Sequence, residues 1–167
     1  LERLGFLNDE SYSKALLETK KRTMKKGPRA IRQDMQKKGI DKTLQDKVLD
    51  SYSHEEQLEL AIELAQKEVR AGARKTPAQI KQKIQDQLMR KGYSFSVVSE
   101  VLEQITLEKG DDEWESLING QGEKVWRKYS TKHAGMELHM KVKQALYQKG
   151  FPLEIIERFL DFKENEE

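Results

Sequence analysis

The segment Met35-Gln-Lys-Lys-Gly-Ile40 decides the fold, because it returns as Leu88-Met-Arg-Lys-Gly-Tyr93 and again as Leu146-Tyr-Gln-Lys-Gly-Phe151. The glycines of these segments lie 53 and then 58 residues apart. A recurrence at such a spacing is typical of tandem structural repeats. The chain is therefore expected to consist of three similar repeats.

Apolar residues match on both sides of the three glycines, Gly39, Gly92 and Gly150. Their spacing before and after each glycine predicts one helix on either side of it. Each glycine is expected to end the first of these helices in the left-handed conformation, where a Cβ atom would clash. The matching sets are Ile31, Ile84 and Val142; Met35, Leu88 and Leu146; Ile40, Tyr93 and Phe151; Leu44, Val97 and Ile155; Val48, Val101 and Phe159; and Leu49, Leu102 and Leu160.

Cap and stop signals add a third helix to each repeat. Ser53 with Glu56, and Thr76 with Gln79, form capping-box patterns that begin two of the helices. We predict an all-α fold of three tandem three-helix repeats that form an elongated, curved array. The predicted repeats are residues 1–53, 54–110 and 111–167.

Two helices carry more detailed expectations. The first is predicted to begin at Asn8 or Asp9 and to end near Lys26. Its inner face is expected to carry Tyr12, Leu16, Thr19 and Thr23. In the third repeat, a break in the first helix is expected near Gly120-Gln-Gly122.

Composition narrows the class of protein. Of the 167 residues, 36% are hydrophobic and 36% are charged, and there is no cysteine. No apolar run approaches the roughly 18 residues of a membrane span. We expect a cytoplasmic protein that does not enter a membrane. The chain begins at Leu1 rather than at methionine, so we expect it to be a fragment of something longer.

Cations gather at the end of the first helix of every repeat, although the net charge falls from +5 through 0 to −3 along the three repeats. Equivalent places in stacked repeats fall on one side of the stack. This pattern predicts a basic stripe suited to a phosphate backbone or an acidic polymer. The alternative is a solvated surface, since helix dipoles favour cations in last turns. The candidate binding residues are Lys20, Lys21, Arg22, Lys25, Lys26, Arg29, Arg32, Lys67, Arg70, Arg74, Lys75, Lys124, Arg127 and Lys128.

The sequence contains no recognisable catalytic motif. The histidines, His54, His133 and His139, are not spaced to place two ligands on one helix face. Gly120-Gln-Gly122 lacks the third glycine of a dinucleotide fingerprint, and no Walker-type loop is present. We therefore predict a protein that is not an enzyme and has no catalytic residue, metal or cofactor.

The chain resembles the RecX family, which regulates the bacterial recombinase RecA. The resemblance lies in Leu4-Gly-Phe-Leu-Asn-Asp-Glu-Ser-Tyr12, in Gly27, Ile31 and Met35, and in Lys38-Gly39-Ile40. It extends over essentially the whole chain and is weakest in the third repeat, whose first helix carries two tryptophans.

This resemblance implies a modulator that lies in the helical groove of the RecA filament on single-stranded DNA. It implies inhibition of strand exchange, ATP hydrolysis and co-protease activity, with effects on DNA repair, DNA recombination and the SOS response. Single- and double-stranded DNA are further expected partners, and a monomer is expected. A general nucleic-acid-binding helical-repeat protein and a protein-only helical scaffold remain alternatives. The sequence does not choose between capping and coating of the filament.

Overall fold

The computed structural model describes the backbone of residues 2–166 and the side chains of residues 9–166. Over this range the chain forms helices and no strand. The predicted all-α class and the three three-helix repeats are confirmed, whereas the elongated, curved arrangement stays a prediction. The helices are α1 (Glu2–Met24), α2 (Pro28–Lys37), α3 (Lys42–Asp50), α4 (His54–Ala71), α5 (Pro77–Lys91), α6 (Phe95–Gln104), α7 (Asp111–Ser130), α8 (Gly135–Gln148) and α9 (Leu153–Glu166).

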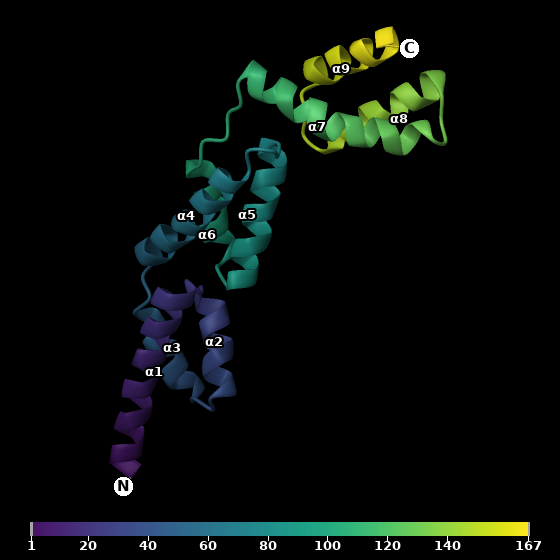
Figure 1. The fold of residues 1–167 in the computed structure, drawn as a ribbon. Helices are drawn as coiled ribbons and strands as arrows, with labels where there is room; N and C mark the ends of the chain where they lie inside the picture. The colour runs from purple at the N-terminus through teal and green to yellow at the C-terminus, as the bar shows by residue number, and fades with distance from the viewer. Residues whose placement is uncertain (1, 167) are drawn as a thin grey trace. The chain divides into compact units, whose positions relative to one another are not determined.

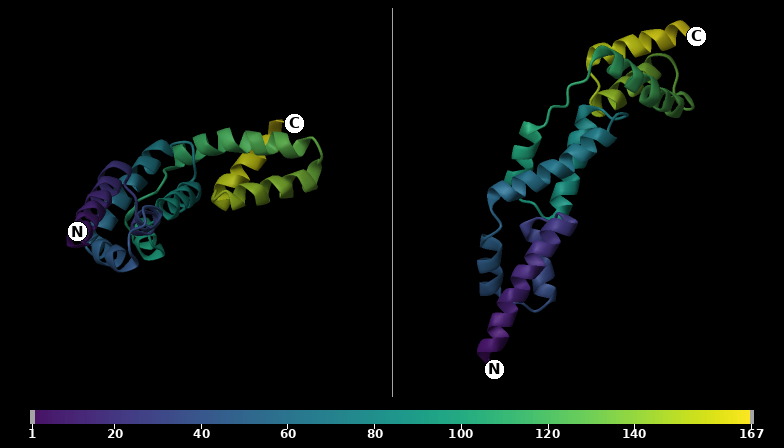
Figure 2. Two further views of the ribbon diagram at one scale, coloured as in Figure 1. Left: turned by 90° about the horizontal axis from the view of Figure 1, so that it is seen from below. Right: turned by 60° about the vertical axis from the view of Figure 1, so that its left-hand side comes forward.

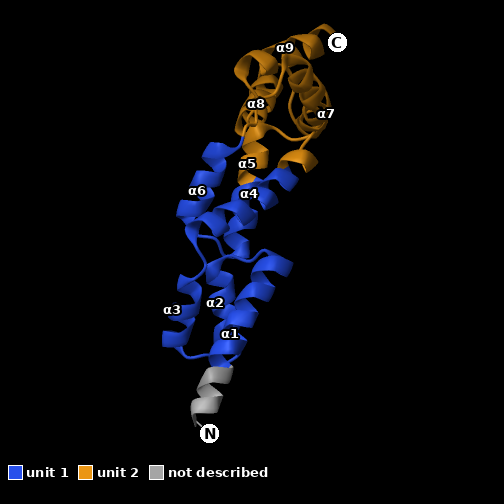
Figure 3. Ribbon diagram, turned by 90° about the vertical axis from the view of Figure 1, so that its left-hand side faces the viewer, with its two compact units in different colours: residues 1–68, 83–105 blue, residues 69–82, 106–167 orange. Residues whose placement is uncertain are grey.

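Internal contacts divide the chain into two compact units (Figure 3). The first unit comprises residues 1–68 and 83–105, and the second comprises residues 69–82 and 106–167. In the first unit α1, α2 and α3 pack against one another, and in the second α7, α8 and α9 do so (Figures 1 and 2). The repeat boundaries after residues 53 and 110 stay predictions.

The three glycines of the repeated segment take the predicted backbone conformation. Their φ angles are +73° at Gly39, +98° at Gly92 and +100° at Gly150. Gly92 directly follows α5, and one lysine separates Gly39 and Gly150 from the last residues of α2 and α8. A left-handed residue at such a place closes a helix. The prediction for these helix ends is confirmed.

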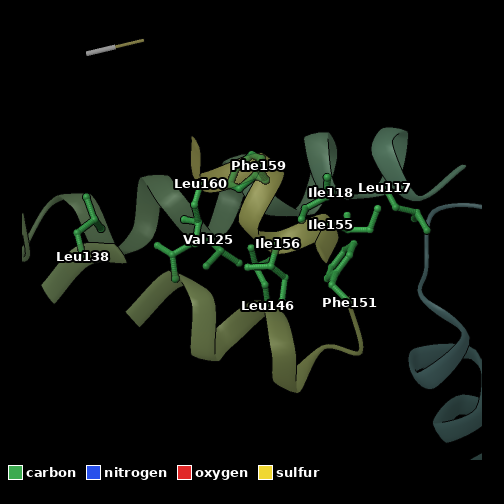
Figure 4. Packing of buried hydrophobic residues seen from close by; sticks show 11 residues of the cluster. Leu117, Ile118, Val125, Leu138, Leu146, Phe151, Ile155, Ile156, Phe159 and Leu160 are labelled. Carbon is green, nitrogen blue, oxygen red and sulfur yellow. The ribbon is translucent and has the colours of Figure 1, made fainter. Parts of the chain in front are cut away.

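The six matching apolar sets form the repeat cores. Five of the sets are buried in all three repeats; in the sixth Leu102 is half-buried, while Leu49 and Leu160 are buried. In the third repeat the buried side chains of α7, α8 and α9 converge on one cluster, with Phe151 at one end of it (Figure 4). A repeat in the sequence is thus a repeat of core positions.

Side-chain caps begin several helices, including the one predicted at Ser53, whose Oγ accepts a hydrogen bond from the Glu56 N–H (3.1 Å). The Asp41 side chain accepts a hydrogen bond from the Thr43 N–H (3.2 Å), and Ser94 accepts one from Val97 (3.3 Å). At the start of α5 the capping box is complete. Thr76 N–H donates to Gln79 Oε1 (2.9 Å), and Gln79 N–H donates to Thr76 Oγ1 (3.2 Å).

The predicted start of the first helix is wrong, and so are three of the four residues predicted for its inner face. Asp9 lies inside α1, where its backbone oxygen accepts a hydrogen bond from Ser13 Oγ (2.6 Å); the side chain of Asn8 lies outside the described residues. The buried face carries Ser13, Leu17 and Lys21, while Tyr12, Thr19 and Thr23 are exposed. Of the predicted inner residues, Leu16 is half-buried and packs against the core. Two of the three residues on the buried face are polar. A prediction from hydrophobic periodicity therefore placed the inner face on the neighbouring side of the helix.

The predicted break at Gly120-Gln-Gly122 is also wrong, because α7 is continuous from Asp111 to Ser130. Gly122 is buried against the ring of Phe159, and a Cβ atom at Gly122 would lie 2.8 Å from that ring. This glycine therefore serves close packing of α9 on α7, not a change of backbone direction.

Helix ends meet inside each unit at what we call the first and second joints. At the first joint the start of α2 meets the end of α5: Gly27 N–H donates to Lys91 O (2.8 Å), and Arg29 N–H donates to Gly92 O (3.1 Å). At the second joint the start of α5 meets the end of α8, and Thr76 Oγ1 donates to Lys149 O (2.5 Å). At the first joint, backbone N–H groups and carbonyls at helix ends thereby satisfy one another, and at the second joint a capping hydroxyl satisfies a carbonyl.

Two tyrosines brace the loop that leads into the first joint. Tyr93 Oη donates to Lys25 O (2.7 Å), and Tyr52 Oη donates to Lys26 O (3.0 Å). Burial raises the pKa of Tyr93 to about 12 and raises the pKa of Tyr52 as well. Lys25 itself has a positive φ of +50°, unusual for a residue with a side chain. The phenols thus hold a strained turn in place.

The raised pKa of Tyr93 predicts a loss of stability at alkaline pH. Between about pH 10 and 12 the unfolded chain gives up this phenol proton while the folded chain retains it. The free energy of unfolding should therefore fall by up to about 1.4 kcal/mol per pH unit for this group. Urea unfolding from pH 8 to 11.5 should show a shallower fall for Tyr93→Phe than for the wild type. The exposed Tyr12→Phe should leave the slope unchanged, and equal slopes for all three proteins would contradict the prediction.

No helix in the described part of the chain has the length and apolar character needed to cross a membrane.

Candidate basic binding surface

The cations at the end of α1 are neutralised within the fold. Lys20 and Lys26 both approach Asp34, at 3.9 and 2.9 Å, and Lys25 pairs with Glu63 at 3.0 Å. All three side chains are only partly exposed. Their charges are therefore compensated before any partner arrives.

Lys21 is the most enclosed of the predicted site residues, with an exposed fraction of 7%. Its ammonium lies 2.8 Å from Glu18, 2.7 Å from Glu56 and 5.3 Å from the centre of the Tyr52 ring. Burial alone would lower the pKa of Lys21, but the hydrogen bonds to Glu18 and Glu56 outweigh it and raise the pKa. The ammonium joins α1 to α4 and is closed to an outside anion.

Two further predicted residues of the first repeat are also paired. Arg22 is largely exposed and lies 3.1 Å from Glu18. Arg32 forms an ion pair with Asp46 (2.8 Å) and donates to Gln45 Oε1 (3.2 Å). Arg29 alone among the seven first-repeat candidates is exposed with no ion pair to another described side chain. The most basic stretch of sequence thus presents little uncompensated charge.

Lys21 and Arg22 should respond differently to charge reversal. Lys21→Glu would place three carboxylates together in a partly buried site and should lower the free energy of unfolding by about 3 to 5 kcal/mol. Lys21→Met should stay within about 1 kcal/mol of the wild type, because Glu18 and Glu56 are exposed enough to remain hydrated. Arg22→Glu, at an exposed position, should change stability by about 0.5 kcal/mol or less. Urea unfolding measures all three, and equal effects of the two reversals would show that Lys21 is not enclosed.

The second and third repeats carry exposed cations without ion pairs to described side chains. Lys67 lies in the first unit, and Arg70, Arg74, Lys124, Arg127 and Lys128 lie in the second. Lys75 is half-buried and engaged within the fold. The free charge of the predicted stripe therefore belongs mainly to the second unit.

Two adjoining hollows on the second unit collect four of its cations. One hollow, of about 340 Å³, is lined by Arg74 and Lys124 together with Ser116, Leu117 and Gln121. The other, of about 390 Å³, is lined by Lys124, Lys128 and Lys149 together with Tyr129 and Gln148. Lys124 borders both, and no carboxylate lines either one. We call this surface the basic groove and define it by Arg74, Lys124, Lys128 and Lys149.

A glutamine fixes one side of the basic groove. Gln121 on α7 donates to the backbone oxygen of Arg74 (2.8 Å) and exchanges hydrogen bonds with the side chain of Gln79 (2.9 Å). Lys109 Nζ also reaches Gly72 O, at 3.5 Å. These contacts hold the segment between α4 and α5 on α7, which brings Arg74 to the hollow that Lys124 lines.

Sequence reasoning missed Lys149 and Tyr129 as parts of this surface. Lys149 was visible as the lysine before Gly150, in line with Lys38 and Lys91. The Tyr129 ring lies beneath Lys128, with 5.4 Å between the ammonium and the ring centre. The ring is half-buried and packs against the core of the third repeat, and it also lines the hollow that Lys124, Lys128 and Lys149 share. An aromatic ring beside cations is a feature that can stack on a nucleic-acid base. Nothing in the spacing of the sequence marked it.

The histidines form surface pairs with carboxylates. His54 contacts Glu100 (2.5 Å), His133 contacts Glu137 (2.9 Å) and His139 contacts Glu164 (2.9 Å). Each histidine thus has one carboxylate neighbour, and none of the three contacts joins two histidines. These are ordinary surface pairs of small energetic weight.

Family models match most of the chain. A model of the third three-helix domain of RecX matches residues 55–102 and again residues 111–160. A model of the second three-helix domain of RecX matches residues 8–49. The last two repeats of the chain thus resemble the same domain type.

Individual relatives give the same result. The chain is 38% identical to the Regulatory protein RecX of Halalkalibacterium halodurans, over 93% of the chain and 58% of that protein. It is 36% identical to the Regulatory protein RecX of Bacillus subtilis, over 95% of the chain and 60% of that protein. The chain therefore spans about three fifths of the length of these curated relatives. Their name is that of a regulatory protein, in agreement with the non-catalytic interpretation of the sequence.

A solved structure supports the fold. The crystal structure of RecX from Lactobacillus salivarius matches with a TM-score of 0.58 and 29% sequence identity. The match covers 63% of this chain and 70% of that chain.

Proposed function

The chain belongs to the RecX family of regulatory proteins, and on this premise we propose that it binds the RecA filament on single-stranded DNA and lowers its activities. The activities concerned are strand exchange, ATP hydrolysis and co-protease function. Lowering them would affect DNA recombination, DNA repair and the SOS response. We propose that the protein acts as a monomer in the cytoplasm.

Family membership is the observation that carries this proposal, because the matched segments include all three repeats. The basic groove adds a physical reason for binding. Its four cations face no carboxylate, so a polyanion would gain attractive contacts there without first breaking ion pairs. A RecA filament on single-stranded DNA carries the phosphates of that DNA, which are anionic.

A general nucleic-acid-binding protein is the second candidate, and the basic groove with its Tyr129 ring favours it. Such a protein would bind single- or double-stranded DNA equally well without RecA. Its affinity would fall steeply with salt, since each neutralised phosphate releases counterions. A protein-only scaffold would show no such dependence.

The test is RecA-dependent ATP hydrolysis on single-stranded DNA while the protein is titrated in. We expect the rate to fall, because the bound protein would impede the filament. Inhibition at far less than one molecule per RecA subunit would indicate capping of filament ends, and inhibition near saturation would indicate coating. An unchanged rate at equimolar protein would contradict the proposal. Fluorescence anisotropy with labelled DNA alone, at several salt concentrations, separates the general DNA-binding alternative.

A further inference from the structure

The two joints are built in the same way. Gly39, the remaining glycine of the repeated segment, closes its helix as Gly92 and Gly150 do. In both joints the start of a helix that carries proline at its first position meets the end of another helix. The prolines are Pro28 at the first joint and Pro77 at the second. At both joints the accepting helix is followed by a left-handed glycine, Gly92 at the first joint and Gly150 at the second.

Glycine is required at each joint because the incoming helix lies against its Cα atom. A Cβ atom at Gly92 would lie 2.4 Å from the backbone nitrogen of Ala30 and 2.6 Å from its Cβ. A Cβ atom at Gly150 would lie 2.6 Å from the Cβ of Ala78. The incoming helix thus presents alanine to glycine in both cases. Larger residues on either side would keep the helices apart.

The joints also pair opposite helix ends electrostatically. The positive end of the incoming helix abuts the negative end of the accepting helix, which favours both. At the first joint the carbonyls of the glycine and of the lysine before it accept hydrogen bonds from the incoming backbone. At the second joint the lysine carbonyl accepts from the Thr76 hydroxyl. The acceptor at each joint is therefore a Lys-Gly pair.

The same pair in the first repeat, Lys38-Gly39, is open. Gly39 closes α2 at a φ of +73°, and a Cβ atom on it would meet nothing within 4 Å. Both residues are exposed. Among the described residues, no hydrogen bond reaches the carbonyl of either Lys38 or Gly39. This site has the glycine, the helix end and the free carbonyls of an acceptor, without an incoming helix.

We propose that Lys38-Gly39 is a docking site for the second helix of a further three-helix repeat that precedes this one in the chain. Two observations identify the occupant. The first repeat matches the second three-helix domain of RecX, and the curated relatives extend well beyond the part that this chain covers. The joints show that the incoming helix begins with proline and places alanine in its first turn.

A second copy of this chain fits the site less well. Among the second helices of the three repeats, α2, α5 and α8, the start that neither joint uses is that of α8, where Ala134 and Gly135 precede Met136. It has no proline at its first position, and Met136 is 78% exposed in its first turn. Met136 is the second residue of α8, the position that Ala78 occupies in α5, and its larger side chain would hold the helices apart. The proposal therefore commits to a preceding repeat.

The test uses an engineered protein, the tandem chain, in which a copy of residues 1–53 is placed directly before Leu1. The original 167 residues stay unchanged. Because the repeat spacing is 53, Gly27 of the duplicate then precedes Gly39 by 65 residues, the same separation as between Gly27 and Gly92. An exposed Gln33→Ser change marks peptides of the duplicate by mass.

Hydrogen exchange followed by mass spectrometry measures whether the joint forms, because its formation slows the exchange of the backbone amides of residues 27–31. We expect these amides of the duplicate to exchange at least tenfold more slowly in the tandem chain than in its Gly39→Asn variant. Asparagine tolerates the left-handed conformation, so it preserves the end of α2 while its side chain fills the docking site. Gly92→Asn serves as the matched control and should release only the original residues 27–31, since it blocks only the first joint.

Two results would overturn the proposal. One is exchange of the duplicate amides at the same rate with and without Gly39→Asn. The other is self-association of the 167-residue chain in sedimentation velocity that Gly39→Asn abolishes, because a second copy would then be the occupant.

Discussion

Gly92→Ala should lower the free energy of unfolding by about 2 to 5 kcal/mol. Two costs add at this position. A left-handed backbone costs a residue with a Cβ atom about 1 to 2 kcal/mol. The new atom would also lie 2.4 Å from the backbone nitrogen of Ala30, where α2 must move away. Overpacking of this kind costs about 1 to 3 kcal/mol. Urea unfolding followed by helical circular dichroism measures the sum.

Two other glycines separate the two costs. Gly39 has the same left-handed conformation but open space around it, so Gly39→Ala should show the backbone cost alone, about 1 to 2 kcal/mol. Gly27 has an ordinary φ of −82°, but its Cβ atom would lie 2.5 Å from the Gly92 carbonyl carbon. Gly27→Ala should therefore show the packing cost alone. Equal effects of Gly92→Ala and Gly39→Ala would show that the first joint does not persist in solution.

Reversal of three charges in the basic groove should weaken binding to the RecA filament more than tenfold at low salt. The variant combines Arg74→Glu, Lys124→Glu and Lys128→Glu, all at exposed positions. The fold should survive, because Gln121 holds the Arg74 segment through a backbone carbonyl that the change leaves intact. Repulsion would replace attraction along a polyanion. Anisotropy with RecA bound to labelled single-stranded DNA measures the loss.

The matched control carries the same change in net charge at exposed lysines outside the basic groove, Lys37→Glu, Lys42→Glu and Lys81→Glu. We expect it to bind within about threefold of the wild type, because none of the three lysines lines the basic groove. If the contacts are to DNA phosphates, the groove variant should also lose about 0.7 per contact from its salt slope. Equal losses in both variants would mean that net charge matters and the groove does not.

The binding surface could be predicted from the sequence far less well than the fold. Lys25, Lys26 and Arg74 look alike in the sequence, as cations near the ends of long helices. In the structure Lys25 and Lys26 face Glu63 and Asp34, whereas Arg74 faces Lys124 across an open hollow. The carboxylates that neutralise the first two come from other helices, and periodicity along one helix carries no information about them.

The sequence by itself determined the repeat. Gly39, Gly92 and Gly150, and the apolar residues at fixed distances from them, predicted the helix ends and nearly all the shared core positions. Such features are local, because a glycine without a Cβ atom and an apolar stripe with helical period act within one or two turns.

Only the tertiary structure decided what each glycine and each charge contacts. Gly39 and Gly92 are equivalent in sequence, yet one is open and the other lies against Ala30 of another repeat. The sequence pattern placed Lys21 among the surface cations. In the structure, carboxylates on two helices and the Tyr52 ring enclose it. The physical reason is that hydrogen bonds and ion pairs act between atoms a few ångströms apart in space, and residues that meet there come from distant parts of the chain.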